Sequence, residues 1–577
     1  MMLLFKRILF VFLIQQIALT FCNIEAQTKG SELIYLQTDR SVYIAGESIY
    51  YKLYVLDKAT KKCSAMSKIG YIILRAVNSS PSLKIRVKID AGMANGSITL
   101  PDTLTSGVYQ LVAFTGFMRN QGEEHFFHKE LTIANRFDKA LDFKLIKSTP
   151  IDSSQFQLPA EEPKIKTDKI EYGMREKVRV NLGKINSKAN VSVSVFEETP
   201  IPSTYKSIVE VLKDSSVIQN NLQVSNYHSP ETKAKLLRGT VVDAKTHQTI
   251  KDAIVLLSCI DSVPNLQYAV SNSMGLFQML LSDYYNGKEL FLTIKDAPEN
   301  QNWQIKIEDE FALSKKWNPS LISENENYKE FIVKSQNIVY INKSYQLYKE
   351  VNHKPLIDDK LICPRFYHCP VTTIFPSDFV ALPDFLEIAV EILPQVRIIK
   401  EKGEYHAQMF NDFLRTFDIH SPAFFLDGVY EDDINKIIEL GSDQIKKIEL
   451  IAAERAFGDL VFGGVISITS KTNEMINIKP ASYSLRLKND NVNRGGGNLV
   501  EVNPTTIQNK NIPLIKQLLY WNPNMELNGT DSTDFEFYTS DNLAKYTIKV
   551  EGISDDGTPI SASSSIQVTN QINVTDK

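Results

Sequence analysis

The stretch TDRSVYIAGESI (Thr38 to Ile49) returns with changes as TDKIEYGMREKV (Thr167 to Val178). Both copies carry Thr-Asp and a basic residue, and then Tyr, Glu and a β-branched residue at identical offsets. Similarity at fixed offsets indicates a repeated structural unit. We therefore expect two related domains in tandem.

The residues around the first copy alternate with the period of a β-strand. In the run from Ile49 to Val55, every second side chain is apolar or aromatic, and turn signals such as IAGE and MANGS separate this run from its neighbours. The pattern predicts an antiparallel β-sandwich over residues 30–135. The repeat predicts a second sandwich over 140–230.

A third sandwich is predicted over 235–308, from LRGTVVDAKTHQTIKDAIVLLSC and SNSMGLFQMLL. Gly239 and Gly275 fall at strand edges or turns, where a missing side chain is useful. Its expected core residues are Val241, Ile254, Leu256 and Phe277. The following segment, 309–382, is predicted to be a helical and irregular connector, because Tyr328, Phe331, Ile332, Ser335 and Ile338 have helical spacing.

Helical and strand patterns mix over 383–473. DFLEIAVEIL predicts a helix that ends at Pro394, and AFFLDGVY predicts a strand that runs into a turn at Asp427 and Gly428. DINKIIEL predicts a second helix, capped by Asp432 or Asp433, and IKKIELIA and GVISITSK predict two strands. The expected unit is a compact α+β domain.

Short alternating strands return in the last part of the chain, over 476–577. They are LLYWNPNMELNG, TDFEFYTSD and AKYTIKVEGISDDGTP. This segment predicts a further sandwich. The predicted fold class is thus mainly β, with tandem sandwiches and one α+β domain.

The N-terminus has the features of a secretory signal over residues 1–26. Lys6 and Arg7 precede a mostly apolar run, and cleavage is expected after Ala26. Lipidation at Cys22 is the alternative, although bulky Phe21 precedes that cysteine. No later stretch offers the roughly 18 to 20 apolar residues of a transmembrane helix, so we expect an exported protein without a helical membrane span.

Two of the remaining cysteines stand close together in CPRFYHC. Cys363 and Cys369 could form a disulfide in an oxidising compartment, or could bind a metal together with His353 and His368. Their spacing matches no familiar zinc pattern, so the disulfide is the preferred hypothesis. Cys63 and Cys259 are expected to be lone buried thiols.

The first sandwich resembles macroglobulin-like domains of exported Bacteroidetes-type proteins. LQTDRSVYIAGESIYYKLYVLD is similar to the opening strands of the second macroglobulin domain, and SGVYQLVAFTGFMRN to its closing strand. The C-terminal segment resembles the macroglobulin-type or immunoglobulin-like domain that ends such proteins. Protease trapping in that superfamily needs a Cys-Gly-Glu-Gln type thioester, which this sequence lacks.

Two further resemblances concern the middle of the chain. Residues 235–308 are similar to the transthyretin-like domain called carboxypeptidase-regulatory. PAFFLDGVY and QIKKIELIAAERAFGDLVFGGVISITSK resemble the plug domain of TonB-dependent receptors, in which Gly463 and Gly464 would form the Gly-Gly step before the last strand. Only 577 − 472 = 105 residues follow Thr472, whereas the barrel of that family needs more than about 200. We therefore expect a plug-like domain without a barrel.

The charge balance of the chain and the catalytic motifs that it lacks argue against several classes of function. The 64 basic and 68 acidic residues nearly balance, which disfavours nucleic acid as a partner. The sequence shows no nucleophile elbow, zinc-binding helix or thioester, so we expect no catalytic residues, no metal and no cofactor. The predicted function is non-enzymatic binding or scaffolding in the periplasm or at the outer membrane, with a protein partner in an outer-membrane barrel or transport complex. The alternative is a macroglobulin-related inhibitor or enzyme that acts on exported polypeptides.

Overall fold

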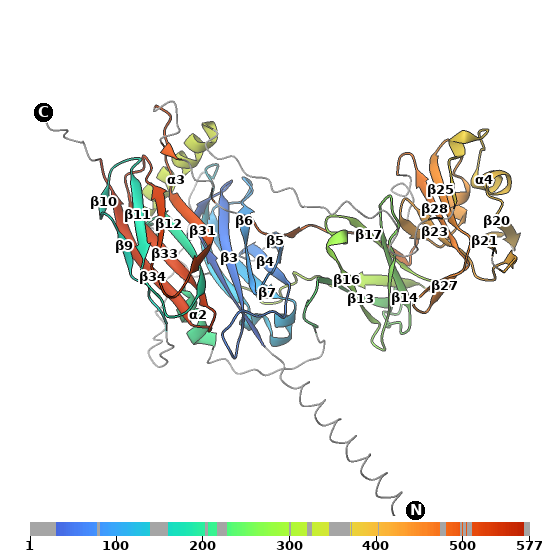
Figure 1. Cartoon of the computed structure of the whole chain (residues 1–577), viewed down its shortest axis with the longest axis horizontal. Coiled ribbons are helices and arrows are strands. Elements are labelled where there is room, and N and C mark those ends of the chain that lie inside the picture. The colour runs from blue at the N-terminus through green and yellow to red at the C-terminus, as the bar shows by residue number, and fades with distance from the viewer. Residues whose placement is uncertain are drawn as a thin grey trace, which may run out of the picture. The chain divides into compact units, whose positions relative to one another are not determined.

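The computed structural model describes the chain as two compact units built mainly from β-strands (Figure 1). The first unit takes its described residues from Met1–Thr232, Phe311–His353 and Asn493–Lys577, and the second from Lys233–Glu310 and Lys354–Val492. The described residues are 31–77, 81–138, 160–201, 206–215, 228–298, 302–319, 326–345, 370, 372–401, 403–412, 414–473, 480–496, 499, 503–504 and 511–570.

The first sandwich in the first unit has the two sheets that the alternating sequence predicts. One sheet has the order β1-β3-β6, and the other contains β2-β8-β7-β4-β5 in that order. Two short 3-10 helices, η1 and η2, precede its last strand. The elements are β1 (Glu32–Thr38), β2 (Val42–Ile44), β3 (Ser48–Asp57), β4 (Ile69–Ala76), β5 (Pro81–Lys88), β6 (Met93–Thr99), β7 (Gly107–Thr115), η1 (Phe117–Gln121), η2 (Glu123–His125) and β8 (Phe127–Ala134).

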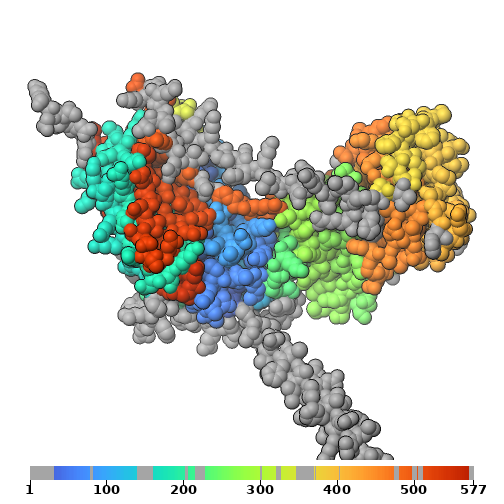
Figure 2. Space-filling model, in the orientation of Figure 1, coloured from blue at the N-terminus to red at the C-terminus, as the bar shows by residue number. Residues whose placement is uncertain are grey.

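The second sandwich combines strands from two distant parts of the chain, residues 165–197 and 518–568. Its sheets have the orders β10-β34-β33-β12-β31 and β32-β11-β9. Its strands are β9 (Ile165–Thr167), β10 (Glu171–Tyr172), β11 (Lys177–Leu182), β12 (Ala189–Glu197), β31 (Leu518–Leu527), β32 (Thr533–Tyr538), β33 (Lys545–Ser554) and β34 (Pro559–Val568). Their side chains form one core. In Figure 2, red atoms of the C-terminal strands border blue-green atoms from residues near 160–200.

This pairing corrects the domain division predicted from the sequence. The segments 140–230 and 476–577 were expected to fold as two separate sandwiches, but β12 pairs with both β31 and β33, and β11 pairs with β32. Each segment supplies half of a single sandwich. The physical reason is that strands of the two segments are interleaved: β33 and β34 lie between β10 and β12, so β9 and β11 are the only neighbouring strands among the described residues of 140–230, and an isolated strand pair is marginally stable.

The two sandwiches share one strand order. The strands β1 to β8 can be matched, in chain order, with β9 to β12 followed by β31 to β34. With this matching, both sheets of the first sandwich have the same strand order as the two sheets of the second. The short connection from β4 to β5 corresponds to residues 198–517, which carry the second unit and two helices of the first. The second sandwich is therefore a copy of the first with a long insertion.

The repeated sequence motif builds the same hydrogen bonds in both copies. The Tyr43 hydroxyl donates to the buried Asp39 carboxylate at 2.8 Å, and the Tyr172 hydroxyl donates to Asp168 at 2.6 Å. Each carboxylate also accepts a backbone N–H from the next long strand, at 2.8 Å and 3.0 Å. The Asp and Tyr positions thus fix the entry of each sandwich, which explains why their spacing is repeated.

The glutamate of the motif closes the following turn. Glu47 accepts the N–H of Ile44 at 2.7 Å, and Glu176 accepts the N–H of Gly173 at 2.6 Å. Each glutamate also pairs with the basic residue of its own copy. The short strands that carry the two tyrosines, β2 and β10, pair in parallel with β8 and β34, respectively.

Two helices of the first unit lie within the insertion, α2 (Ile208–Ser215) and α3 (Glu326–Ser344). The amphipathic helix predicted from Tyr328 to Ile338 is confirmed as part of α3, and its buried Ile332 and Val339 pack against Val42 and Ile44 of the first sandwich. No helix among the described residues is both long enough and apolar enough to cross a membrane.

The second unit begins with a seven-stranded sandwich. Its sheets are β16-β13-β18 and β15-β14-β17-β29. The elements are β13 (Lys235–Asp243), β14 (Ile254–Cys259), β15 (Gln267–Val270), β16 (Leu276–Leu281), η3 (Asp283–Tyr285), β17 (Glu289–Ile294), β18 (Trp303–Ile307) and β29 (Ser484–Lys488), with β30 (Val492–Asn493) following. Strand β29 falls in the segment predicted as the C-terminal sandwich, so its pairing with β17 is a second correction.

The α+β domain of the second unit is built on a five-stranded sheet of order β19-β25-β28-β23-β24. The two predicted helices and the predicted strands are present. The elements are β19 (Thr372–Ile374), η4 (Pro376–Asp378), α4 (Phe385–Ile392), β20 (Val396–Glu401), β21 (Glu404–Asn411), β22 (Thr416–Phe417), β23 (Ala423–Leu426), β24 (Val429–Glu431), α5 (Asn435–Ile438), β25 (Ile445–Ile451), β26 (Arg455–Phe457), β27 (Leu460–Phe462) and β28 (Val465–Ser470).

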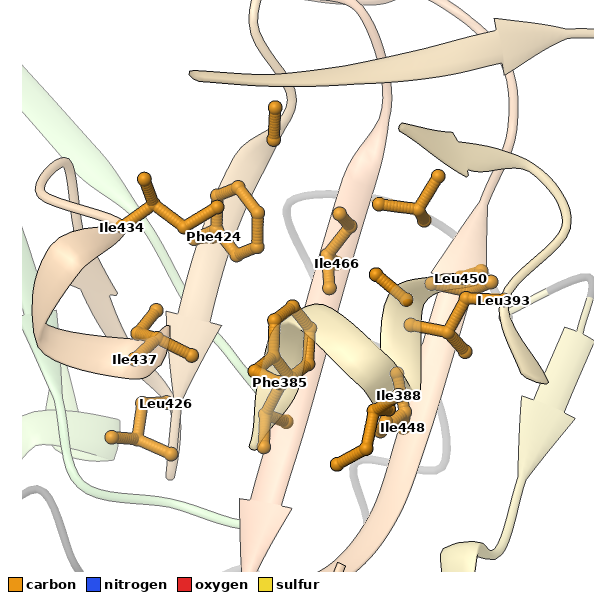
Figure 3. Close-up of a cluster of buried hydrophobic side chains, with 14 of the residues drawn as sticks. Phe385, Ile388, Leu393, Phe424, Leu426, Ile434, Ile437, Ile448, Leu450 and Ile466 are labelled. Carbon is orange, nitrogen blue, oxygen red and sulfur yellow. The ribbon is translucent and has the colours of Figure 1, made fainter. Parts of the chain in front are cut away.

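Helix α4 covers one face of this sheet (Figure 3). The Asp384 side chain accepts the N–H of Glu387 at 2.9 Å and so caps the first turn. The helix buries positions at helical spacing, among them Phe385 and Ile388, against Phe424 and Ile466 of the sheet. The predicted helix is therefore present, and its buried positions follow the helical periodicity of the sequence.

A polar interface joins the two sandwiches of the first unit. The hydroxyl of Tyr35 donates to the Glu551 carboxylate, and the Lys549 ammonium lies 3.5 Å from the same carboxylate. Burial raises the pKa of Glu551 to about 8 and lowers the pKa of Lys129 and of Lys549 to about 7. The interface therefore contains groups that titrate near neutral pH.

Replacing Glu551 by Gln should reduce the pH dependence of stability. The folded-state pKa of about 8 exceeds the unfolded value of about 4.3, so the folded state retains a proton between these values. The stabilisation is complete below about pH 4.3 and is lost as pH rises towards 8, by up to about 1.4 kcal/mol per pH unit. Urea unfolding near about pH 5 and about pH 7 measures this slope. We expect a smaller loss of stability in Glu551→Gln than in the wild type.

The exposed carboxylate Glu536 provides the control. The variant Glu536→Gln should keep the wild-type slope over the same pH range, because this group is paired at the surface with Lys177 and Arg179. Equal slopes for the wild type and Glu551→Gln would contradict the assignment of the buried proton to Glu551.

Candidate functional site

The turn between β23 and β24 contains two of the residues predicted from the sequence. Asp427 has φ +51° and Gly428 has φ +85°, which suits a tight two-residue hairpin. The Asp427 carboxylate accepts the N–H of Ser470 at 2.7 Å and its hydroxyl at 2.8 Å. Asp427 therefore ties the hairpin to the end of β28.

Gly428 brings this hairpin close to the neighbouring sandwich of the same unit. A Cβ at this position would lie 2.5 Å from the carbonyl oxygen of Asp261 and 2.9 Å from that of Cys259. The N–H of Asp261 donates to the carbonyl of Asp427 at 3.0 Å. A shared apolar cluster continues the contact, with Leu256 and Leu266 of the sandwich packed beside Phe425. The turn joins the two domains of the second unit.

The two glycines before β28 occupy a crowded place. A Cβ on Gly463 would lie 2.1 Å from the carbonyl oxygen of His420, and a Cβ on Gly464, where φ is +146°, would lie 2.7 Å from that of Ile451. The N–H of Gly463 donates to Ser421 at 3.1 Å. These glycines hold the segment before β23 against the end of β27.

Three side chains that could bind a metal ion lie close together beside Gly463 and Gly464. They are Asp418, His420 and Glu454, and one ligand-type atom from each lies within 4.8 Å of the other two. The His420 Nδ1 is 3.1 Å from Asp418 Oδ1 and 3.5 Å from Glu454 Oε2. The arrangement could hold a divalent cation.

The immediate surroundings favour the ionised form of Asp418. Burial alone would raise its pKa, but hydrogen bonds from the backbone N–H and ring of His420 outweigh burial and hold the pKa of Asp418 below its usual value. The carboxylate therefore remains charged at neutral pH, as a metal ligand must.

The sequence predicts the glycine step but not this cluster. In the sequence, the members of the cluster appear as the short stretch DIH at 418–420 and as Glu454, the first residue of ERAFGDLVFGG. No motif links residues that lie 34 positions apart (454 − 420). Only the fold brings them together.

The predicted pair Cys363 and Cys369, with His353 and His368, lies outside the described residues, as does Cys22. Cys259 is buried, as expected, and burial raises the pKa of its thiol to about 11. Cys63 is partly buried, and burial also raises the pKa of its thiol. Neither of these two thiols has the lowered pKa of a reactive cysteine.

Comparison with known proteins gives no family assignment. No protein-family model matches the sequence, and no curated protein matches it. Trypsin-activated alpha-2-macroglobulin from Escherichia coli has a TM-score of 0.24 and 7% identity, with 93% of this chain and 42% of that chain covered. The form activated by porcine elastase has a TM-score of 0.24 and 10% identity, with coverage of 93% and 44%.

A Salmonella alpha-2-macroglobulin that was reacted with methylamine has a TM-score of 0.15 and 6% identity, with 94% of this chain and 24% of that chain covered. This chain therefore spans less than half of the length of these proteins. The fold of this chain is defined by its own strand order and contacts.

Replacing Gly463 by Ala should destabilise the α+β domain by about 2 kcal/mol or more, because the new Cβ would overlap backbone atoms. Hydrogen exchange of peptides covering residues 409–426 and 460–470 provides a local measure. We expect faster exchange in both segments.

Gly107→Ala is the matched control, since the nearest atom to a Cβ there is 4.0 Å away. Its exchange in the two segments should equal that of the wild type. Unchanged exchange in Gly463→Ala would refute the crowding at the glycine step.

Proposed function

We propose that this chain is an exported, non-enzymatic modular protein of the bacterial cell envelope, which binds another protein through its α+β domain. The resemblance to receptor plug domains supports a docking role, because it concerns a module that works in contact with outer-membrane protein. The proposed partner belongs to an outer-membrane complex. The macroglobulin-like sandwiches would serve as the scaffold that carries the docking module.

The observation that carries this proposal is the exposed apolar surface of the α+β domain. Seven of the 18 exposed large apolar residues among the described positions lie between 372 and 473. They are Phe375, Phe379, Val380, Val390, Leu414, Ile419 and Val461. Exposed apolar side chains that gather on one module favour a protein contact.

Helix α4 carries both buried and exposed apolar side chains. Its Phe385 and Ile388 are buried against the sheet, whereas Val390 on the same helix is 78% exposed. An aliphatic side chain gains nothing from this position in the isolated chain. A partner that covers the outer face of α4 would bury it.

The insertion supports a scaffold role. The second unit is inserted into the second sandwich between β12 and β31, at the position where the first sandwich has only the short connection from β4 to β5. The chain therefore leaves from and returns to two paired strands, β12 and β31. Domains carried in such connections can differ without disturbing the framework that holds them.

A surface variant tests the proposed contact. Replacing Val380 by Ser and Val390 by Gln removes apolar side chains from the outside of the α+β domain and leaves its core intact. After mild crosslinking of cells that export the protein, we expect the main crosslinked envelope adduct to decrease several-fold. Immunoblotting of the adduct provides the measurement.

Ile170→Ser provides the control, because Ile170 is 77% exposed but lies in the second sandwich. Its adduct should match that of the wild type. Equal adducts for the wild type and the Val380 and Val390 variant would exclude these two side chains from the binding surface.

A further inference from the structure

We propose that Asp418, His420 and Glu454 form a binding site for a divalent transition-metal ion of the Zn²⁺ type. The site lies on the α+β domain, on the segment that leads into β23 and at the residue immediately before β26. It is independent of the protein contact proposed above, because it uses none of the residues tested there.

The distances agree with three ligands on one side of a single ion. Zn²⁺ bonds to histidine nitrogen and carboxylate oxygen are about 2.0–2.2 Å long, so neighbouring ligand atoms in a tetrahedron lie about 3.4 Å apart. The observed separations from His420 Nδ1 are 3.1 Å to Asp418 and 3.5 Å to Glu454. The Asp418 and Glu454 ligand atoms lie within 4.8 Å of each other. Binding of the ion at Nδ1 would replace the ring N–H that donates to Asp418, and this proton would be released to solvent.

The charge of the cluster also favours a cation. Asp418 and Glu454 both face the imidazole, and among the described residues no lysine or arginine forms an ion pair with either carboxylate. The Asp418 side chain is only 4% exposed, so water screens its charge weakly. A bound divalent ion would neutralise both carboxylates at once.

The protein holds the ligands before any ion arrives. The N–H of Asp418 donates to Met409 at 2.9 Å, and the N–H of His420 donates to the Asp418 carboxylate at 2.9 Å. The contact of Gly463 with the His420 carbonyl fixes the same loop from the other side. The binding free energy is therefore not spent on ordering this backbone.

The opposite side of the cluster is open to solvent. His420 is 40% exposed and Glu454 is 49% exposed at their side chains. Water could then fill the remaining position of a four-coordinate ion. The single imidazole favours Zn²⁺ over Ca²⁺ or Mg²⁺, which prefer shells made only of oxygen.

Isothermal titration of the full mature chain with ZnCl₂ at neutral pH tests this inference. We expect His420→Ala and Glu454→Gln each to weaken Zn²⁺ binding at this site at least about tenfold, or to remove one ion from the measured stoichiometry. Both side chains are partly exposed, so both variants should fold. Ca²⁺ should not compete at equal concentration.

His406→Ala is the matched control, because His406 is an exposed histidine on β21 of the same domain. It should bind Zn²⁺ as the wild type does. A second readout is Co²⁺, whose visible absorption bands should appear in the wild type and His406→Ala but be lost in His420→Ala. Identical Zn²⁺ titrations for the wild type and His420→Ala, or the absence of binding to the wild type, would overturn the proposal.

Discussion

The fold of the first unit depends on β12 pairing with strands that follow a very long insertion. In the first sandwich, four residues connect β4 to β5, whereas 517 − 197 = 320 residues separate β12 from β31. Loop-closure entropy grows by about 0.6 kcal/mol for each doubling of loop length, so this difference costs roughly 4 kcal/mol for a flexible loop. Folded domains within the insertion reduce the effective length. The central strand β12 offsets the cost by burying Val191, Val193 and Val195 completely.

In the second unit, close contacts between backbone segments hold neighbouring elements together. The turn at Asp427 and Gly428 contacts the seven-stranded sandwich, and the step at Gly463 and Gly464 contacts the loop that carries His420. Both contacts need glycine because backbone atoms occupy the space of a side chain. The residues that look like a family signature in the sequence thus have local packing roles. The candidate metal ligands lie next to one of these contacts, which positions them.

Local features of the fold followed from the sequence. The alternation in β3, the helical pattern of α4 and the turn at Asp427 were all predicted, since each depends on neighbours in the chain. Helix α5 is shorter than DINKIIEL suggested, and it begins at Asn435, whose N–H donates to Asp433 at 3.0 Å. Asp433 therefore supports the start of the helix, although it is not the capping residue itself.

The partners of the strands could not be predicted in the same way. Alternation tells which side chains of β33 face a core but not which strand lies beside it. Turns and apolar faces are alike in a complete sandwich and in half of one, so 476–577 resembled an independent domain. Likewise, nothing in the sequence joins Asp418 and His420 to Glu454, because their proximity results from the packing of the segment before β23 beside the start of β26.

An engineered disulfide tests most directly that residues 165–197 and 518–568 form one sandwich. Asn181 on β11 lies opposite Asp534 on β32, and their side chains are hydrogen bonded at 2.6 Å. Opposed residues in antiparallel strands have Cα separations of about 4.5–5.5 Å, within the range of a disulfide. The variant carrying Asn181→Cys and Asp534→Cys should therefore yield a peptide linked through these positions under mild oxidation, as detected by mass spectrometry, while each single variant should not. Failure of the folded double variant to form this link would contradict a sandwich shared between these two segments.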